Sequence, residues 1–106
     1  MTLHTVKKLV IITEKMIATK VCASLEDLGA SGYTTVAAGG KGSRNVRSMT
    51  ERASVIDDFS NVKIETIIAD EKTAEEIMRK IAEQHFENYS GITYIEDVQI
   101  LRPAKF

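Results

Sequence analysis

The sequence predicts an α+β domain with the ferredoxin-like order βαββαβ, in which two helices cover one face of an antiparallel sheet. Three observations support this: a continuous β-branched apolar run at residues 7–13, two segments of helical periodicity, and an apolar–polar alternation over residues 62–68. A chain of 106 residues is long enough for one domain with a core. Its formal net charge of −1 provides no global attraction to nucleic acid.

The first half of the chain predicts a strand, a helix and a second strand. Residues 7–13 are typical of a central strand. Thr13 is a suitable N-cap for the following helix, with Glu14 in its first turn, and Gly29 is expected to end that helix. A second strand at about residues 32–38 then leads into a glycine-rich segment. The apolar stripe of the helix consists of Ile17, Val21, Leu25 and Leu28.

The second half predicts a strand, a helix and a last strand. The alternation over residues 62–68 places Lys63 and Glu65 on the face opposite the apolar residues. Thr73 and Glu76 form a candidate capping box for the second helix, and the last strand is expected at residues 92–101. The apolar side of the second helix consists of Ala74, Ile77, Met78, Ile81, His85 and Phe86.

Two features of this arrangement point to function. Apolar residues occur on both faces of the predicted strands, whereas two helices cover only one face, which indicates self-association into a closed oligomer. The second and third strands should be joined by a hairpin of about two to five residues. The chain instead has a long segment without clear periodicity, residues 40–60. Such long loops in compact domains are usually functional or disordered.

The start of this loop, residues 39–47 (GGKGSRNVR), combines three glycines with three cations. Glycine lets the backbone approach a ligand closely, and successive N–H groups can form a concavity that binds anions. The guanidinium groups of Arg44 and Arg47 suit phosphate oxygens. A phosphate or nucleotide site and a solvated basic loop are both compatible with this composition. A Walker loop is excluded, because no Gly-Lys-Ser/Thr ending opens a helix here.

The remaining reactive residues suggest neither a metal site nor catalysis by cysteine. Cys22 is the single cysteine, so an internal disulfide is excluded, and a buried thiol is expected. His4 and His85 lack the spacing of metal ligands. The longest apolar run, residues 9–12, is too short to cross a bilayer, and no signal-peptide pattern is present, so we expect a cytoplasmic protein.

Several blocks of the sequence resemble the PII-like signalling proteins, and most closely their SbtB-type branch. The most specific block is residues 39–48 (GGKGSRNVRS). The others are residues 8–15 (KLVIITEK), 32–34 (GYT), 74–77 (AEEI) and the segment from Phe86 to Ile95. They occur in the family's order over nearly the whole chain. The resemblance implies one PII-like domain over residues 1–106, with the family's T-loop at about residues 40–60.

The resemblance also implies a homotrimer that binds an adenine nucleotide (cyclic AMP, AMP, ADP or ATP) between subunits and changes its T-loop conformation. Some relatives bind bicarbonate beside the nucleotide, and cyanobacterial ones bind the bicarbonate transporter SbtA, so a membrane transporter is the implied partner. By position, Gly39, Gly40, Lys41 and Gly42 would cradle the nucleotide. Arg44 and Arg47 would hold its phosphates, and Gly91, Ile92 and Thr93 would line the other wall.

These expectations describe a non-catalytic sensor. The main alternative is a slow nucleotide hydrolase (ATP/ADP diphosphohydrolase) on the same fold, which would need a positioned base or a metal. Glu14, Asp57 and Asp58 are the carboxylates near the loop ends, but they form no evident acid–base pair. An RNA-binding module would require stacking aromatics and a basic surface, which neither Tyr33 and Tyr94 nor the net charge supports.

Overall fold

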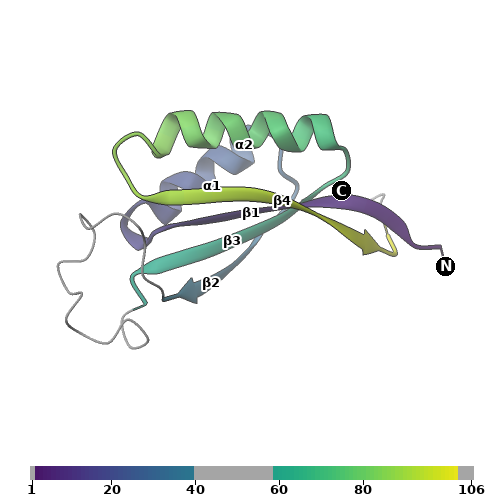
Figure 1. Cartoon of the computed structure of the whole chain (residues 1–106), viewed down its shortest axis with the longest axis horizontal. Helices are drawn as coiled ribbons and strands as arrows, with labels where there is room; N and C mark the ends of the chain where they lie inside the picture. The colour runs from purple at the N-terminus through teal and green to yellow at the C-terminus, as the bar shows by residue number, and fades with distance from the viewer. Residues whose placement is uncertain (1, 40–58, 103–106) are drawn as a thin grey trace.

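The structure is a computed structural model that describes residues 2–39 and 59–102. Its strands form one antiparallel sheet in the order β2-β3-β1-β4, and both helices lie on the same face of it (Figure 1). The elements are β1 (His4–Glu14), the 3₁₀ turn η1 (Lys15–Ile17), α1 (Ala18–Asp27), β2 (Thr34–Ala38), β3 (Asn61–Ile68), α2 (Glu71–His85) and β4 (Gly91–Ile100). The predicted βαββαβ fold is confirmed. The predicted T-loop lies, except for residues 59 and 60, outside the described residues.

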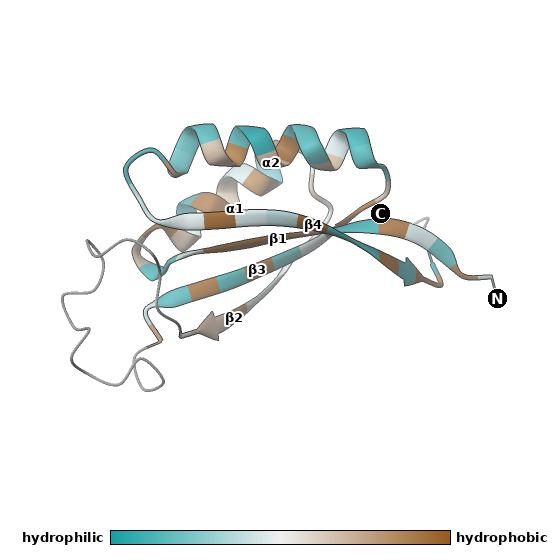
Figure 2. Cartoon of the chain, viewed as in Figure 1, coloured by the Kyte–Doolittle hydropathy of each residue, from teal (hydrophilic) through white to brown (hydrophobic). Residues whose placement is uncertain are grey.

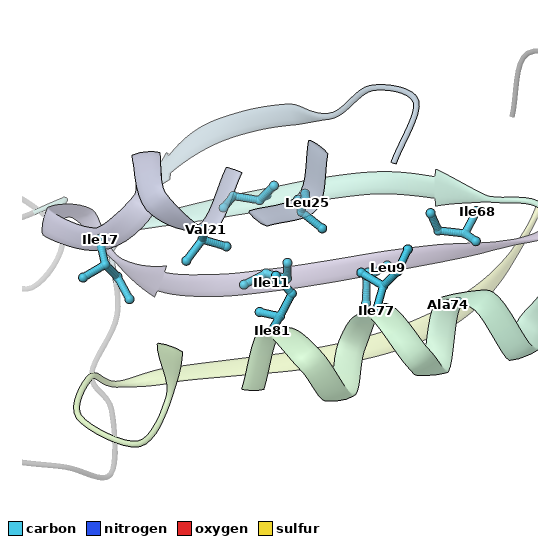
Figure 3. Close-up of a cluster of buried hydrophobic side chains, with 10 residues drawn as sticks. Leu9, Ile11, Ile17, Val21, Leu25, Ile68, Ala74, Ile77 and Ile81 are labelled. Atoms are coloured by element: carbon cyan, nitrogen blue, oxygen red, sulfur yellow. The ribbon is translucent and has the colours of Figure 1, made fainter. Parts of the chain in front are cut away.

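The core lies between the helices and the covered face of the sheet (Figure 3). Leu9 and Ile11 of β1 are completely buried there, as is Ile64 of β3. Full burial of such side chains contributes about 1.5–3 kcal/mol each. The outward side of α2 is largely hydrophilic (Figure 2), as expected for a helix that packs through one stripe. From the helical segments, the core receives Ile17, Val21, Leu25, Ala74, Ile77 and Ile81.

The end of β1 differs from the prediction. Thr13 and Glu14 do not cap a helix: both belong to β1, and the Glu14 side chain makes no capping hydrogen bond to η1. The reason is that β1 is a central strand with neighbours on both sides. Thr13 pairs with Val62 of β3 and with Gly91 of β4, and this pairing outweighs the local capping preference.

The end of α1 agrees with the prediction from the sequence, whereas the start of α2 differs from it. Gly29 follows α1 with φ at 101°, the left-handed conformation in which glycine commonly ends a helix. The cap of α2 lies three residues earlier than predicted, because Asp70 Oδ2 accepts a hydrogen bond from Thr73 N at 2.9 Å. This hydrogen bond lowers the pKa of the Asp70 carboxyl group.

The face of the sheet away from the helices is here called the open face. Cross-strand pairing places Val36, Lys63, Ile12 and Ile92 in one row across it. Val36 is 51% exposed and Ile92 is 58% exposed. The face is less apolar than the sequence indicated, because four charged residues lie on it in a chain of ion pairs. These pairs join Lys8 to Glu65 at 3.7 Å, Lys8 to Glu96 at 3.3 Å and Lys63 to Glu65 at 3.3 Å.

Candidate functional site

Four strand ends meet at one end of the sheet, on the left in Figure 1. There β2 finishes at Ala38, which pairs with Asn61 at the start of β3. Asn61 in turn pairs with Glu14 at the end of β1, and the neighbouring Thr13 pairs with Gly91, the first residue of β4. This end of the sheet therefore presents the exit from β2 and the entry to β4 on one side of the molecule.

The described part of the predicted site lies at this end. Gly39 follows β2 directly and is exposed, and Gly91, Ile92 and Thr93 are the first residues of β4. Gly39 nevertheless follows one edge strand, β2, and Gly91 begins the opposite edge strand, β4. Three strand spacings separate those edges, which amounts to about 14 Å. The other predicted residues, Gly40, Lys41, Gly42, Arg44 and Arg47, lie outside the described residues.

The end of β1 holds its neighbours through hydrogen bonds that the sequence analysis did not foresee. Lys15 N donates to Ser60 O at 2.8 Å, which fixes the entry to β3. On the other side, Ser90 N donates to Glu14 Oε2 at 2.6 Å, and Thr13 Oγ1 donates to Ser90 O at 3.2 Å. We call the group of Thr13, Glu14 and Ser90 the sheet-end clamp. The sequence shows that Thr13 and Glu14 follow the apolar run of residues 9–12, but it does not show that their partner is Ser90.

Two hydroxyl groups beside the clamp are buried without a hydrogen-bond partner among the described residues. They are Ser90 Oγ and Thr93 Oγ1. A buried polar atom without a partner costs about 1–3 kcal/mol, so such atoms commonly bind water or a ligand. Both lie in the segment that leads from the clamp into the exposed start of β4.

Gly91 is required by packing. A Cβ atom at this position would lie 2.2 Å from Phe86 Cε1 and 2.4 Å from Phe86 Cζ, far inside ordinary contact distance. Phe86 packs against the core just after α2. The start of β4 can therefore lie this close to α2 only because residue 91 has no side chain.

Titratable residues elsewhere in the described chain have hydrogen bonds and pKa shifts with structural causes. Ser24 Oγ and His85 Nε2 lie 2.9 Å apart and join α1 to α2. Burial lowers the pKa of His85, as does nearby Lys20 to a lesser extent. The hydrogen bond that Tyr33 donates to Glu26 is the main reason that the Tyr33 pKa is raised to about 12. Cys22, expected to be buried, is half-buried against the core, and burial is the main reason that the pKa of its thiol is raised.

Neither a metal centre nor a membrane span is found within residues 2–39 and 59–102. No group of three or more His, Cys, Asp or Glu side chains in these ranges is arranged to hold a metal ion. None of the helices described there has the length and apolar character needed to cross a membrane.

The chain belongs to the family described as Nitrogen regulatory protein P-II, which it matches over residues 6–105. Among solved structures it is similar to a PII-like signalling protein from Thermus thermophilus. The identity is 33% and the TM-score 0.78, and the match covers 100% of this chain and 99% of that one.

The chain is also similar to CPII from Thiomonas intermedia. CPII bound to ADP, AMP and acetate matches with 29% identity and a TM-score of 0.79, covering 100% of this chain and 98% of that one. CPII bound to ADP and bicarbonate matches with 29% identity and a TM-score of 0.78, covering 99% and 97%. The family match and the near-complete coverage of these relatives identify the chain as a PII-like protein.

Proposed function

We propose that this PII-like protein is an SbtB-type sensor of adenine nucleotides that regulates the uptake or use of inorganic carbon. In this proposal the whole chain, residues 1–106, is one domain, and the T-loop at about residues 40–60 transmits the ligand state to a partner. A bicarbonate transporter in the membrane is the partner we favour, with the sensor at its cytoplasmic surface. The ligand is AMP, ADP, ATP or cyclic AMP, with bicarbonate as a second ligand.

The observation that carries the proposal is the position of the basic glycine-rich block. It follows β2 directly and so begins, at Gly39, at the end of the sheet where β4 also starts. The block supplies backbone N–H groups and two arginines, which suit phosphate oxygens. CPII, which matches this chain over nearly its whole length, is bound to ADP and AMP in one structure and to ADP and bicarbonate in another.

The spacing of the strands favours a site between subunits. Within one chain, a ligand that contacted Gly39 and Gly91 together would have to span about 14 Å across the sheet end. If one wall comes from residues 39–47 of one subunit and the other from residues 91–93 of a neighbour, the ligand need not cross the sheet end of one chain. We therefore assign the two walls to different subunits of a homotrimer.

The open face is the surface through which the subunits would associate. Exposed Ile92 lies there beside Ile12, and exposed Val36 lies in the same row on the far side of Lys63. Burying these side chains would remove apolar surface from water at about 25 cal/mol per Å². The ion pairs of Lys8 and Lys63 leave these charges partnered on that face, so its burial would not leave them isolated.

A sensor is favoured over a nucleotide hydrolase by the chemistry at the sheet end. The described carboxylate there, Glu14, accepts a hydrogen bond from a backbone N–H group and so is engaged in structure. A hydrolase would need a free base or a metal to activate water. We expect binding without appreciable turnover.

The test compares three arginine variants in nucleotide binding. If Arg44 and Arg47 hold phosphate oxygens, Arg44→Ala and Arg47→Ala should each weaken ADP binding by about 1.5–3 kcal/mol, the range for hydrogen bonds to charged groups. Arg47→Lys should recover part of the loss, because an ammonium group lacks the guanidinium fork. Arg52→Ala, which also removes one cation from the loop, serves as the matched control and should bind ADP normally.

Calorimetry measures the affinities, and release of phosphate from ADP or ATP is followed in parallel. Unchanged ADP affinity in Arg44→Ala and Arg47→Ala, together with lost binding in Arg52→Ala, would show that the phosphate site has been misplaced. Sustained turnover that is lost in a Glu14, Asp57 or Asp58 variant would favour the hydrolase instead.

A further inference from the structure

We infer that Glu14 is a positioning residue for the nucleotide site: its carboxylate holds Ser90, and through Ser90 it sets the position of the wall formed by residues 91–93. The inference rests on the proposed function, and it assigns Glu14 a role through Ser90 and no contact with the ligand. Its evidence lies in the hydrogen bonds of the sheet-end clamp, all of which involve described residues.

The register of β1 and β4 brings Glu14 opposite Ser90. Their backbone ladder ends at the pair Thr13–Gly91, and the next pair in register would be Glu14 with Ser90. At that position side chains of β1 take over the hydrogen bonding. Glu14 Oε2 accepts from Ser90 N at 2.6 Å, and Thr13 Oγ1 donates to Ser90 O at 3.2 Å. Both backbone polar groups of Ser90 are thus bonded to side chains of one neighbouring strand.

Two of the three clamp residues, Thr13 and Ser90, are buried. Ser90 is 5% exposed and Thr13 is completely buried, whereas Glu14 is half-buried, so the clamp is partly shielded from water. A hydrogen bond to a charged acceptor is stronger than one between neutral groups, and partial shielding reduces the competition from water. If the acceptor were removed, the buried N–H group of Ser90 would have to find water, and the chain at Ser90 would move to reach it.

The residue that the clamp holds, Ser90, leads directly into the proposed wall, residues 91–93. Ser90 is followed immediately by Gly91 and Ile92, which are exposed, and by Thr93, whose hydroxyl has no partner among the described residues. Packing against Phe86 already limits how far Gly91 can move toward α2. The clamp limits movement of this segment away from β1, within the plane of the sheet. Together they define where the wall faces a ligand.

The experiment uses the full chain and the variants Glu14→Ala, Glu14→Gln and Thr13→Val. Glu83→Ala, at an exposed position of α2, is the matched control for loss of one carboxylate. Amide hydrogen exchange at Ser90 reports the clamp directly, calorimetry with ADP and with AMP reports the site, and sedimentation reports the assembly state. Glu14→Gln keeps an oxygen acceptor at the same place without the charge.

We expect Ser90 to exchange faster in Glu14→Ala, and ADP and AMP to bind about tenfold more weakly, by the same factor for both, which corresponds to about 1.4 kcal/mol. Glu14→Gln should restore most of the affinity, and Thr13→Val should show a smaller loss of the same kind. Glu83→Ala should match the wild type. If Glu14→Ala does not fold, Glu14→Gln and Thr13→Val decide the question through the same readouts.

Two results would overturn the inference. One is unchanged affinity in Glu14→Ala although Ser90 exchanges faster. The other is a gain in affinity in Glu14→Gln that is larger for ADP than for AMP, which would mean that Glu14 acts on the phosphates directly through its charge. If the wild type binds neither nucleotide, the proposed function fails, and the exchange rates alone then decide whether Glu14 holds Ser90.

Discussion

Substitution of Gly91 by alanine tests whether the start of β4 is fixed against α2 as described. The added Cβ would meet three ring carbons of Phe86 at 2.2, 2.4 and 2.7 Å. Ordinary carbon–carbon contacts are about 3.5–4.0 Å, so the ring or the strand must move by more than about 1 Å. Phe86 packs against the core, which restricts the ring.

The expected effect follows from the cost of overpacking a well-packed site, about 1–3 kcal/mol of unfolding free energy. Each 1 kcal/mol lowers the Tm of a domain of this size by about 4–8 °C. Because the same residue begins the proposed wall, Gly91→Ala should also weaken ADP binding. Phe86→Leu should relieve the clash, so the double variant should be more stable than the sum of the single effects predicts.

Two other glycines provide matched controls. A Cβ at Gly32 would meet nothing within 4 Å, so Gly32→Ala should be neutral or slightly stabilising through the unfolded chain. Gly29 also has open space but a φ of 101°, so Gly29→Ala should cost about 1 kcal/mol through backbone strain alone. Denaturant unfolding of the three variants gives the comparison. Equal stability of Gly91→Ala and Gly32→Ala would refute the packing of Gly91 against Phe86.

Two further predictions concern the helix pair and the open face. Because the pKa of His85 is lowered in the folded state, the unfolded chain binds a proton at this histidine more readily than the folded chain does. The free energy of unfolding should therefore fall as the pH drops from about 6.5 through the folded-state pKa. His85→Asn should flatten this part of the dependence of unfolding free energy on pH and His4→Asn should retain it, whereas an unchanged dependence in His85→Asn would contradict the role given to His85. On the open face, Val36→Glu should weaken self-association as measured by sedimentation. Thr35→Glu should not weaken it, because Thr35 lies on the same strand but on the other face. Equal sedimentation of both variants would contradict association through the open face.

Periodicity was sufficient to predict the fold. The alternation of β3 and the three- and four-residue spacing in both helices reflect burial on one face, which is a strong and local signal. Gly29 was predictable for the same kind of reason, since the left-handed end of a helix favours glycine. The glycine-rich block was recognisable from its composition, although residues 40–47 lie outside the described structure.

The clamp could not be predicted, because it depends on partners far along the chain. Thr13 and Glu14 look like a helix cap when only the next residues are considered. Their actual partner is Ser90, 76 residues beyond Glu14, and it is brought there by the pairing of β1 with β4. Similarly, Asp70 rather than Thr73 caps α2, because the chain takes an extended conformation at Asp70 before the helix begins. In each case tertiary geometry chose between local options of similar energy.

Titration of the wild-type protein with ADP and AMP, with adenosine as the comparison and with and without bicarbonate, tests whether this chain binds adenine nucleotides through their phosphates. We expect saturable binding of both nucleotides and much weaker binding of adenosine, because adenosine has no phosphate for the arginines of residues 39–47 to hold. Absence of ADP and AMP binding by a correctly folded oligomer, or adenosine binding as tight as that of ADP, would contradict it.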